Sequence, residues 1–145
     1  MDRRLQIVFD AHDPLALGTF WQEALGYVRE APPEGFASWE ETLRAWGLPE
    51  DRWNDANAIV DPEGSGPRIF LQKVPEGKTA KNRVHLDVGL PGAPARPGER
   101  RVDGIRARAG ELEALGASRV REHDDEVQGF WIVMQDPEGN EFCLV

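Results

Sequence analysis

The sequence has one cysteine, no long apolar run and no excess of basic residues, and each shortage excludes a class of protein. Cys143 alone cannot form an intramolecular disulfide, so a reducing, cytoplasmic location is expected. The longest apolar run covers residues 130–134, far short of the roughly 20 residues that a membrane-spanning helix needs. The net charge of −9 disfavours nucleic acids and anionic membranes as partners. A chain of 145 residues predicts one domain.

Two short segments occur twice in the same order. Asp-Pro-Glu-Gly occupies residues 61–64 and 136–139, and Ala-Leu-Gly occupies residues 24–26 and 114–116. The number of residues between the two Asp-Pro-Glu-Gly segments differs from the number between the two Ala-Leu-Gly segments. This difference indicates extra residues in the first copy. Within that extra stretch, Ser38 and Glu41 form the Ser-x-x-Glu pattern of a helix capping box. We therefore predict an inserted helix over about 38–48.

Each copy is predicted to be a strand, a helix and three further strands. In the first copy alternation favours a strand at 5–9, and a helix is expected from the cap at Asp13 to the stop at Gly26. The remaining expected strands of this copy cover 27–29, 58–60 and 68–74. In the second copy we expect a strand at 83–88, a helical stripe over 105–115, and strands at 118–121, 130–135 and 140–145. The modules then span about 3–76 and about 82–145 of a single domain, 1–145.

This arrangement resembles the vicinal oxygen chelate superfamily, which includes glyoxalase I, fosfomycin-resistance enzymes, extradiol dioxygenases and bleomycin-resistance proteins. The resemblance rests on the duplicated βαβββ unit with its Asp-Pro-x-Gly turns, on Phe20-Trp21 before Ala-Leu-Gly, and on Val-His-Leu-Asp-Val at 84–88. The sequence of these motifs is most similar to the glyoxalase-like domain branch of that superfamily. The resemblance implies an α+β fold in which two tandem βαβββ modules form an open, cup-shaped mixed sheet with helices outside. It also implies a small-molecule ligand in the cup and a homodimer.

Strand alternation then sorts the side chains that would face this cup. If the apolar positions pack under the helices, the alternate positions are left for a ligand. The residues expected on the cup side are Gln6, Arg68, Phe70, Gln72, Arg83, His85, Asp87, Glu141 and Cys143. Trp131 lies on a strand near the cleft and is also a candidate ligand contact, although alternation alone leaves its face open.

Metal-dependent relatives use one ligand from each of four strands, and the resemblance carries these positions to Gln6, Phe70, His85 and Cys143. Only His85 is a conventional ligand, and Phe70 offers no lone pair. We therefore expect no metal of the family type and no other cofactor. The alternative is a divalent metal at His85, for example zinc held by Gln6, His85, Cys143 and Glu141.

Two functions of different classes remain. The first is a metal-free protein that binds a small aromatic or natural-product molecule, using the polar cup residues and stacking on Phe70. The second is an enzyme (a lyase, isomerase or dioxygenase) in which His85 acts as a general base with Glu141 or Asp87 orienting it. On this reading, His85 and Glu141 are the candidate catalytic residues.

Three of the five tryptophans lie in or beside the predicted insertion. Trp39, Trp46 and Trp53 gain little from exposure, so they are expected to be covered. They either pack the inserted helix onto the surface of the domain, or form an aromatic wall over the cup or at a subunit contact.

Overall fold

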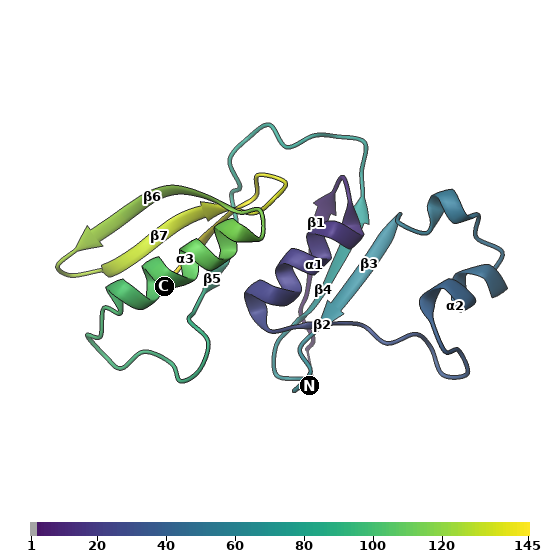
Figure 1. The fold of residues 1–145 in the computed structure, drawn as a ribbon, viewed down its shortest axis with the longest axis horizontal. Helices are drawn as coiled ribbons and strands as arrows, with labels where there is room; N and C mark the ends of the chain where they lie inside the picture. The colour runs from purple at the N-terminus through teal and green to yellow at the C-terminus, as the bar shows by residue number, and fades with distance from the viewer. Residues whose placement is uncertain (1–2) are drawn as a thin grey trace. The chain divides into compact units, whose positions relative to one another are not determined.

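The computed structural model describes residues 3–145, which fall into two compact units (Figure 1). The first unit is Met1–Gly77, described from Arg3 onward, and the second is Lys78–Val145. We call them unit 1 and unit 2. Each contains one open four-stranded mixed sheet and a long helix, so the predicted duplicated α+β unit is confirmed. Among the described residues, no helix has both the length and the apolar character that crossing a bilayer requires.

Unit 1 is a strand–helix–strand unit followed by an insertion and two more strands. Its elements are β1 (Gln6–Ala11), α1 (Pro14–Leu25), β2 (Val28–Arg29), α2 (Trp39–Ala45), the short 3-10 helix η1 (Glu50–Arg52), β3 (Ala56–Val60) and β4 (Arg68–Lys73). The sheet order is β1-β4-β3-β2, with β1 parallel to β4 and the other neighbours antiparallel.

Helix α1 begins and ends where the sequence predicts. The Asp13 side chain accepts a hydrogen bond from the Ala16 N–H at 3.1 Å, and Gly26 ends the helix in the left-handed region at φ 70°. Gly18 faces the sheet so closely that a Cβ there would lie 2.3 Å from Nδ2 of Asn57. The missing side chain at Gly18 therefore allows α1 to pack directly on β3.

Alternate residues of the unit 1 sheet lie on opposite faces. Ile59, Ile69 and Leu71 are buried under α1. Arg68 and Phe70 alternate with them on β4 and lie on the other face, which we call the open face of unit 1. This matches the alternation predicted for β4.

The insertion forms a helix, as predicted, although the helix is shorter. The Ser38 hydroxyl accepts a hydrogen bond from the Glu41 N–H at 3.1 Å, and the Glu41 carboxylate reaches back to the Ala37 N–H at 2.9 Å. Helix α2 ends at Ala45, and the chain then turns through η1 before entering β3. In Figure 1, α2 lies on the far side of β3 from α1.

Unit 2 repeats the plan without an insertion. Its elements are β5 (Asp87–Val88), α3 (Val102–Ala114), β6 (Ser118–Asp125), β7 (Gly129–Gln135) and β8 (Glu141–Leu144). The sheet order is β5-β8-β7-β6, with β5 parallel to β8. Ile132 and Leu144 are buried neighbours on the face that α3 covers. Trp131 and Cys143 lie on the opposite face, the open face of unit 2, since they alternate with those residues.

The strand predicted over 83–88 is mostly absent. Only Asp87 and Val88 pair with β8, so Arg83 and His85 lie in the segment that leads into the strand. Val84, one of the apolar positions that strand alternation placed under a helix, is instead 82% exposed. The reason is that the preceding chain is held by side chains instead of a strand ladder: the Asn82 N–H donates to the Glu141 carboxylate at 2.9 Å.

Candidate functional site

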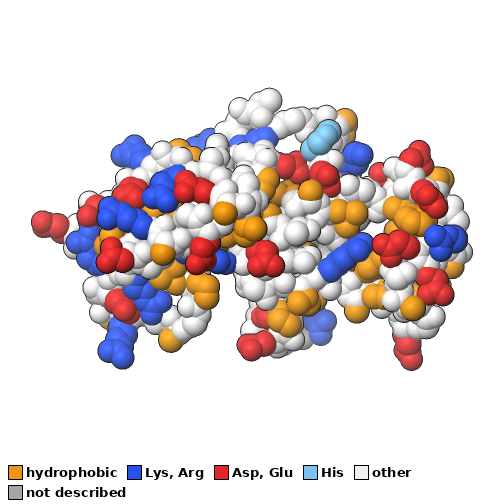
Figure 2. Space-filling model, viewed as in Figure 1, with side chains coloured by type: hydrophobic (Ala, Val, Ile, Leu, Met, Phe, Trp, Pro, Cys, Tyr) orange, Lys and Arg blue, Asp and Glu red, His pale blue; other side chains and the backbone are white. Residues whose placement is uncertain are grey.

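Unit 1 contains a cavity of about 260 Å³ between its open face and the insertion. The sheet contributes Phe70, Arg68 and Ala58, while the insertion contributes three tryptophans and two leucines. The lining side chains from the insertion are Trp39, Leu43, Trp46, Leu48 and Trp53. Figure 2 shows hydrophobic side chains gathered at the α2 end of unit 1 with charged side chains around them. The tryptophans of the insertion therefore line a cavity over the sheet of unit 1, but Trp46, which was expected to be covered, is largely exposed.

The tryptophan walls are fixed by hydrogen bonds of their indole groups. Trp39 Nε1 donates to the Glu30 carbonyl oxygen at 2.7 Å, and Trp53 Nε1 donates to the Leu48 carbonyl oxygen at 2.8 Å. Trp46 is 61% exposed and meets the Trp39 ring edge-on, with centroids 6.3 Å apart. Because the indole donors of Trp39 and Trp53 are already satisfied, these walls offer ring surface to a ligand instead of polar groups.

The floor of the cavity carries an ion pair. Arg68 donates to both Glu30 carboxylate oxygens, at 2.7 and 2.6 Å, and its Nη1 donates to Gln6 Oε1 at 2.8 Å. The Arg68 guanidinium also lies 5.4 Å from the Phe70 ring centroid. Hydrogen bonds from Arg68 lower the pKa of Glu30, so the pair stays charged at neutral pH.

Two lining charges were not anticipated from the sequence. Glu30 follows the short β2 and has no motif; only the pairing of β2, β3 and β4 brings it beside Arg68. Arg29 also lines the cavity, and its Nε is buried without a hydrogen-bond partner. Of the residues predicted in this half of the chain, Gln6, Arg68 and Phe70 are brought together. Gln72 instead donates to Asp10 at 2.9 Å and is exposed.

Unit 2 brings three predicted residues together at the start of its sheet. Donor atoms of His85, Asp87 and Cys143 all lie within 4.8 Å of one another, and His85 Nε2 is 3.5 Å from Asp87 Oδ1. His85 and Asp87 are exposed, whereas Cys143 is buried. Burial raises the pKa of the Cys143 thiol, and the Asp87 carboxylate raises it further, so the thiol is protonated at neutral pH. This opposes a nucleophilic role for Cys143.

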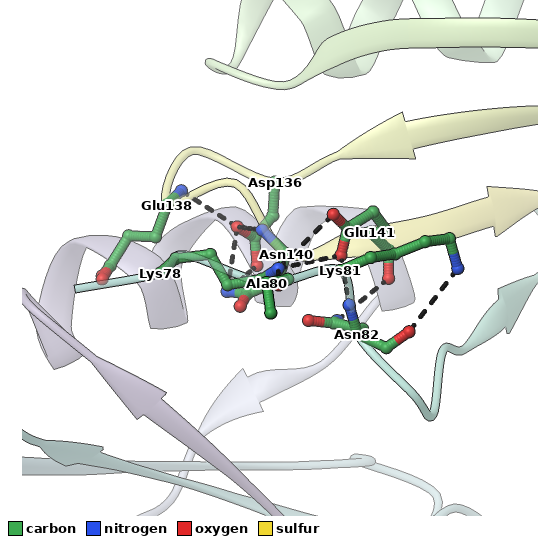
Figure 3. Close-up of polar contacts among 8 residues, drawn as sticks. All are labelled: Lys78, Ala80, Lys81, Asn82, Asp136, Glu138, Asn140 and Glu141. Carbon is green, nitrogen blue, oxygen red and sulfur yellow. Dashed lines mark hydrogen bonds and ion pairs between the residues drawn. The ribbon is translucent and has the colours of Figure 1, made fainter. Parts of the chain in front are cut away.

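Glu141 is engaged elsewhere, as Figure 3 shows. Its carboxylate accepts the Asn82 N–H at 2.9 Å and lies 3.1 Å from Lys78 Nζ. Burial disfavours the charged carboxylate, but the hydrogen bonds and the Lys78 ammonium outweigh it and lower the pKa of Glu141 to about 2. Glu141 is not a member of the His85 cluster, and the carboxylate beside His85 belongs to Asp87.

The remaining predicted residues of unit 2 lie outside that cluster. Arg83 is exposed. Trp131 is half-buried on the open face and stacks on His123, with centroids 4.7 Å apart and planes 5° from parallel. His123 was not singled out from the sequence; its place opposite Trp131 follows from the register of β6 and β7.

The side chains do not provide the four-ligand metal site of the family. Among the four carried-over positions, Phe70 has no donor atom, and the oxygen of Gln6 already accepts a hydrogen bond from the cationic Arg68. A guanidinium beside two of the four positions repels a metal cation. The three donors in unit 2 are a different set, because Asp87 is not one of the carried-over positions.

Comparison with solved structures shows relatives of the same fold. A glyoxalase/bleomycin resistance protein/dioxygenase family enzyme from Burkholderia phytofirmans PsJN has a TM-score of 0.62 at 12% identity, covering 96% of this chain and 94% of that one. A fosfomycin resistance protein from Listeria monocytogenes, with manganese(II) and dihydroxypropylphosphonic acid, has a TM-score of 0.56 at 13% identity, covering 99% and 87%.

A bleomycin-binding protein from Streptomyces verticillus, complexed with copper(II)-bleomycin, has a TM-score of 0.52 at 12% identity, covering 100% of this chain and 96% of that one. No curated protein sequence matches the chain. The sequence profile of the glyoxalase-like domain matches residues 6–145.

Proposed function

Since this chain belongs to the glyoxalase-like domain family, whose fold serves many chemistries, we propose its function from its own site: it binds a small aromatic molecule in the unit 1 cavity. The observation that carries the proposal is the cavity of about 260 Å³ walled by Trp39, Trp46 and Trp53 above Phe70. Concave sites lined by aromatic side chains with a few fixed polar groups are typical of ligand pockets. In this cavity, the ion pair between Arg68 and Glu30 supplies the fixed polar groups.

This proposal places binding, without chemical conversion, in unit 1. No family metal site is needed for it, because the contacts are ring stacking and hydrogen bonds. The bleomycin-binding relative and the fosfomycin resistance relative are named for small molecules, which is consistent with a small-molecule ligand.

Titration calorimetry with a panel of one- and two-ring aromatic compounds tests the proposal. We expect at least one compound to bind the native protein and to bind roughly tenfold more weakly to Phe70→Ala. His85→Ala in unit 2 is the matched control and should bind as the native protein does. Failure of every compound to bind, or equal binding by Phe70→Ala, would overturn the proposal.

A second candidate function is favoured by the unit 2 cluster. The approach of His85 to Asp87 supports acid–base chemistry at His85 with Asp87 as the orienting carboxylate. The nitrogen, oxygen and sulfur donors of His85, Asp87 and Cys143 also suit zinc, which is the atypical metal alternative.

Elemental analysis of protein purified without chelators separates these alternatives. The primary proposal expects no stoichiometric metal. One equivalent of zinc that is lost in both His85→Ala and Cys143→Ser would favour the second candidate function instead.

The arrangement of the two units is also a proposal. By analogy with the family we propose that they belong to one domain, and that two chains form a homodimer. A single cooperative melting transition and a dimer mass by light scattering are the expected results. Two separated transitions or a monomer mass would contradict them.

A further inference from the structure

Oppositely charged side chains line the unit 1 cavity as ion pairs. Arg68 Nη2 lies 2.6 Å from a Glu30 carboxylate oxygen, and Arg52 Nε lies 2.8 Å from an Asp55 carboxylate oxygen. The Arg52–Asp55 pair is the more exposed of the two, so solvent screens its charges more strongly. The charge that a ligand meets in the cavity is therefore set mainly by Arg68 and Glu30.

Arg29 borders the same cavity but adds no unpaired charge to it. Its charge acts on the Glu40 carboxylate of α2, and its Nε is buried. A buried nitrogen offers a ligand no surface to contact. The charge balance of the cavity therefore depends on the ion pairs and not on Arg29.

The pair of Arg68 and Glu30 is fixed by further hydrogen bonds. Arg68 donates to both carboxylate oxygens of Glu30 and, through Nη1, to Gln6 Oε1 at 2.8 Å. The Glu30 carbonyl oxygen accepts a hydrogen bond from Trp39 Nε1 at 2.7 Å. A guanidinium that donates to both oxygens of a carboxylate forms one of the stronger ion-pair geometries. A ligand therefore meets a fixed pair of opposite charges beside Trp39, instead of a single charge.

This pair disfavours a charged ligand of either sign. An anionic group must compete with Glu30 for Arg68, and a cationic group must compete with Arg68 for Glu30. A cation must also compete with the Arg68 guanidinium for the Phe70 ring, because that guanidinium lies 5.4 Å from the ring centroid. A charged group that enters without a partner loses hydration and gains no counter-charge in return. An uncharged aromatic molecule meets none of these costs.

We infer that the Arg68–Glu30 ion pair determines the specificity of this cavity, which selects uncharged aromatic molecules over aromatic acids and amines. The inference rests on the proposed function and specifies its ligand class. The cavity of about 260 Å³ lies just below the roughly 300–1,000 Å³ of pockets for drug-sized ligands, so one ring or two fused rings are expected. Removing either partner should reverse the selection, since it leaves the other charge unpaired.

Three probes with the same ring system test the effect of ligand charge. Naphthylmethanol, naphthoate and naphthylmethylammonium are neutral, negative and positive. Calorimetry with the native protein should show naphthylmethanol binding at least roughly fivefold more tightly than either charged probe. Glu30→Gln leaves Arg68 unpaired and should make naphthoate the tightest of the three. Arg68→Met leaves Glu30 unpaired and should make naphthylmethylammonium the tightest.

Two further variants separate the ion pair from general damage to the cavity. The double variant that combines Glu30→Gln with Arg68→Met removes both charges, so naphthylmethanol should again bind most tightly. Glu122→Gln is the matched control, because Glu122 forms an ion pair with Arg106 at 2.9 Å in unit 2. This control should keep the native order of affinities. A general loss of packing cannot move the preference towards the anion in one variant and towards the cation in the other.

The outcomes distinguish this inference from the proposed function. A charged probe that binds the native protein as tightly as naphthylmethanol would refute the selection for uncharged ligands while leaving an aromatic pocket. An unchanged order of affinities in either single variant would refute the role of the ion pair. No binding by any probe would contradict the proposed function itself. The native-protein series decides the selectivity even if one of the variants does not fold.

Discussion

The two units share one βαβββ plan but differ in what covers the open face of the sheet. In unit 1 the insertion brings α2 and η1 against that face and encloses an aromatic cavity over Phe70. Unit 2 has no insertion, and its open face carries the polar cluster of His85, Asp87 and Cys143. The same backbone unit therefore presents an apolar pocket in one copy and a set of donor atoms in the other. The difference lies in a connection between strands, not in the sheet.

The largest expected effect concerns the helices of the two units. Gly18→Ala in α1 should destabilise the protein by about 1–3 kcal/mol, because the new Cβ would lie 2.3 Å from Asn57 Nδ2. Gly110→Ala in α3 meets no atom within 4 Å and should stabilise by about 0.5–1 kcal/mol through helix propensity. Denaturant unfolding measures both. Changes of the same sign would show that α1 does not pack on β3 as described.

The next effect concerns the contacts of Glu141 in unit 2. Glu141→Gln should cost roughly 1–2 kcal/mol at neutral pH, because it removes the charged acceptor of the Asn82 N–H and the Lys78 ammonium. The pKa of Glu141 is lowered from 4.5 to about 2, so its contribution is complete above about pH 4.5 and is lost as the pH falls towards 2.

Urea unfolding at a series of pH values measures this contribution. The native protein and Glu141→Gln should converge in stability at the acid end of that window. Glu126→Gln, in the exposed turn between β6 and β7, is the control and should match the native protein throughout. A Glu141→Gln deficit that stays constant from pH 6 to pH 2 would contradict the assigned contacts.

Some features of the two units could be predicted from the sequence and others could not. The cap at Asp13, the stop at Gly26 and the alternation of β4 are local signals, and all three were read correctly. The prediction of a strand over 83–88 was mostly wrong, because alternation cannot reveal that a segment lacks a neighbouring strand to pair with. Glu30 and Arg29 could not be predicted as cavity residues from the sequence. Their place beside the cavity depends on how β2 pairs with β3, which no local sequence pattern encodes.

A smaller effect separates binding from stability in unit 1. Trp46→Ala should weaken an aromatic ligand by roughly tenfold, because one ring wall is lost. The same change should alter the free energy of unfolding by less than about 0.5 kcal/mol, since Trp46 is already 61% exposed. Calorimetric titration and thermal melting measure the two quantities. A large loss of stability with unchanged affinity would reassign Trp46 to packing.

The smallest effect is expected for a substitution in unit 2 and its influence on the affinity for the aromatic ligand. His85→Ala removes the centre of the unit 2 cluster and should change the affinity for the aromatic ligand by less than about twofold. Titration of the same ligand under identical conditions checks this. A tenfold loss would place His85 in the binding site and would contradict binding confined to unit 1.

The most direct test of the aromatic cavity follows the indole N–H resonances of the five tryptophans by two-dimensional NMR during titration with an aromatic compound that binds in calorimetry. We predict shifts for Trp39, Trp46 and Trp53, which line the cavity. Trp21, a buried residue of α1, and Trp131 in unit 2 should be unaffected. Shifts confined to Trp131, or none at saturating ligand, would contradict a binding site in unit 1.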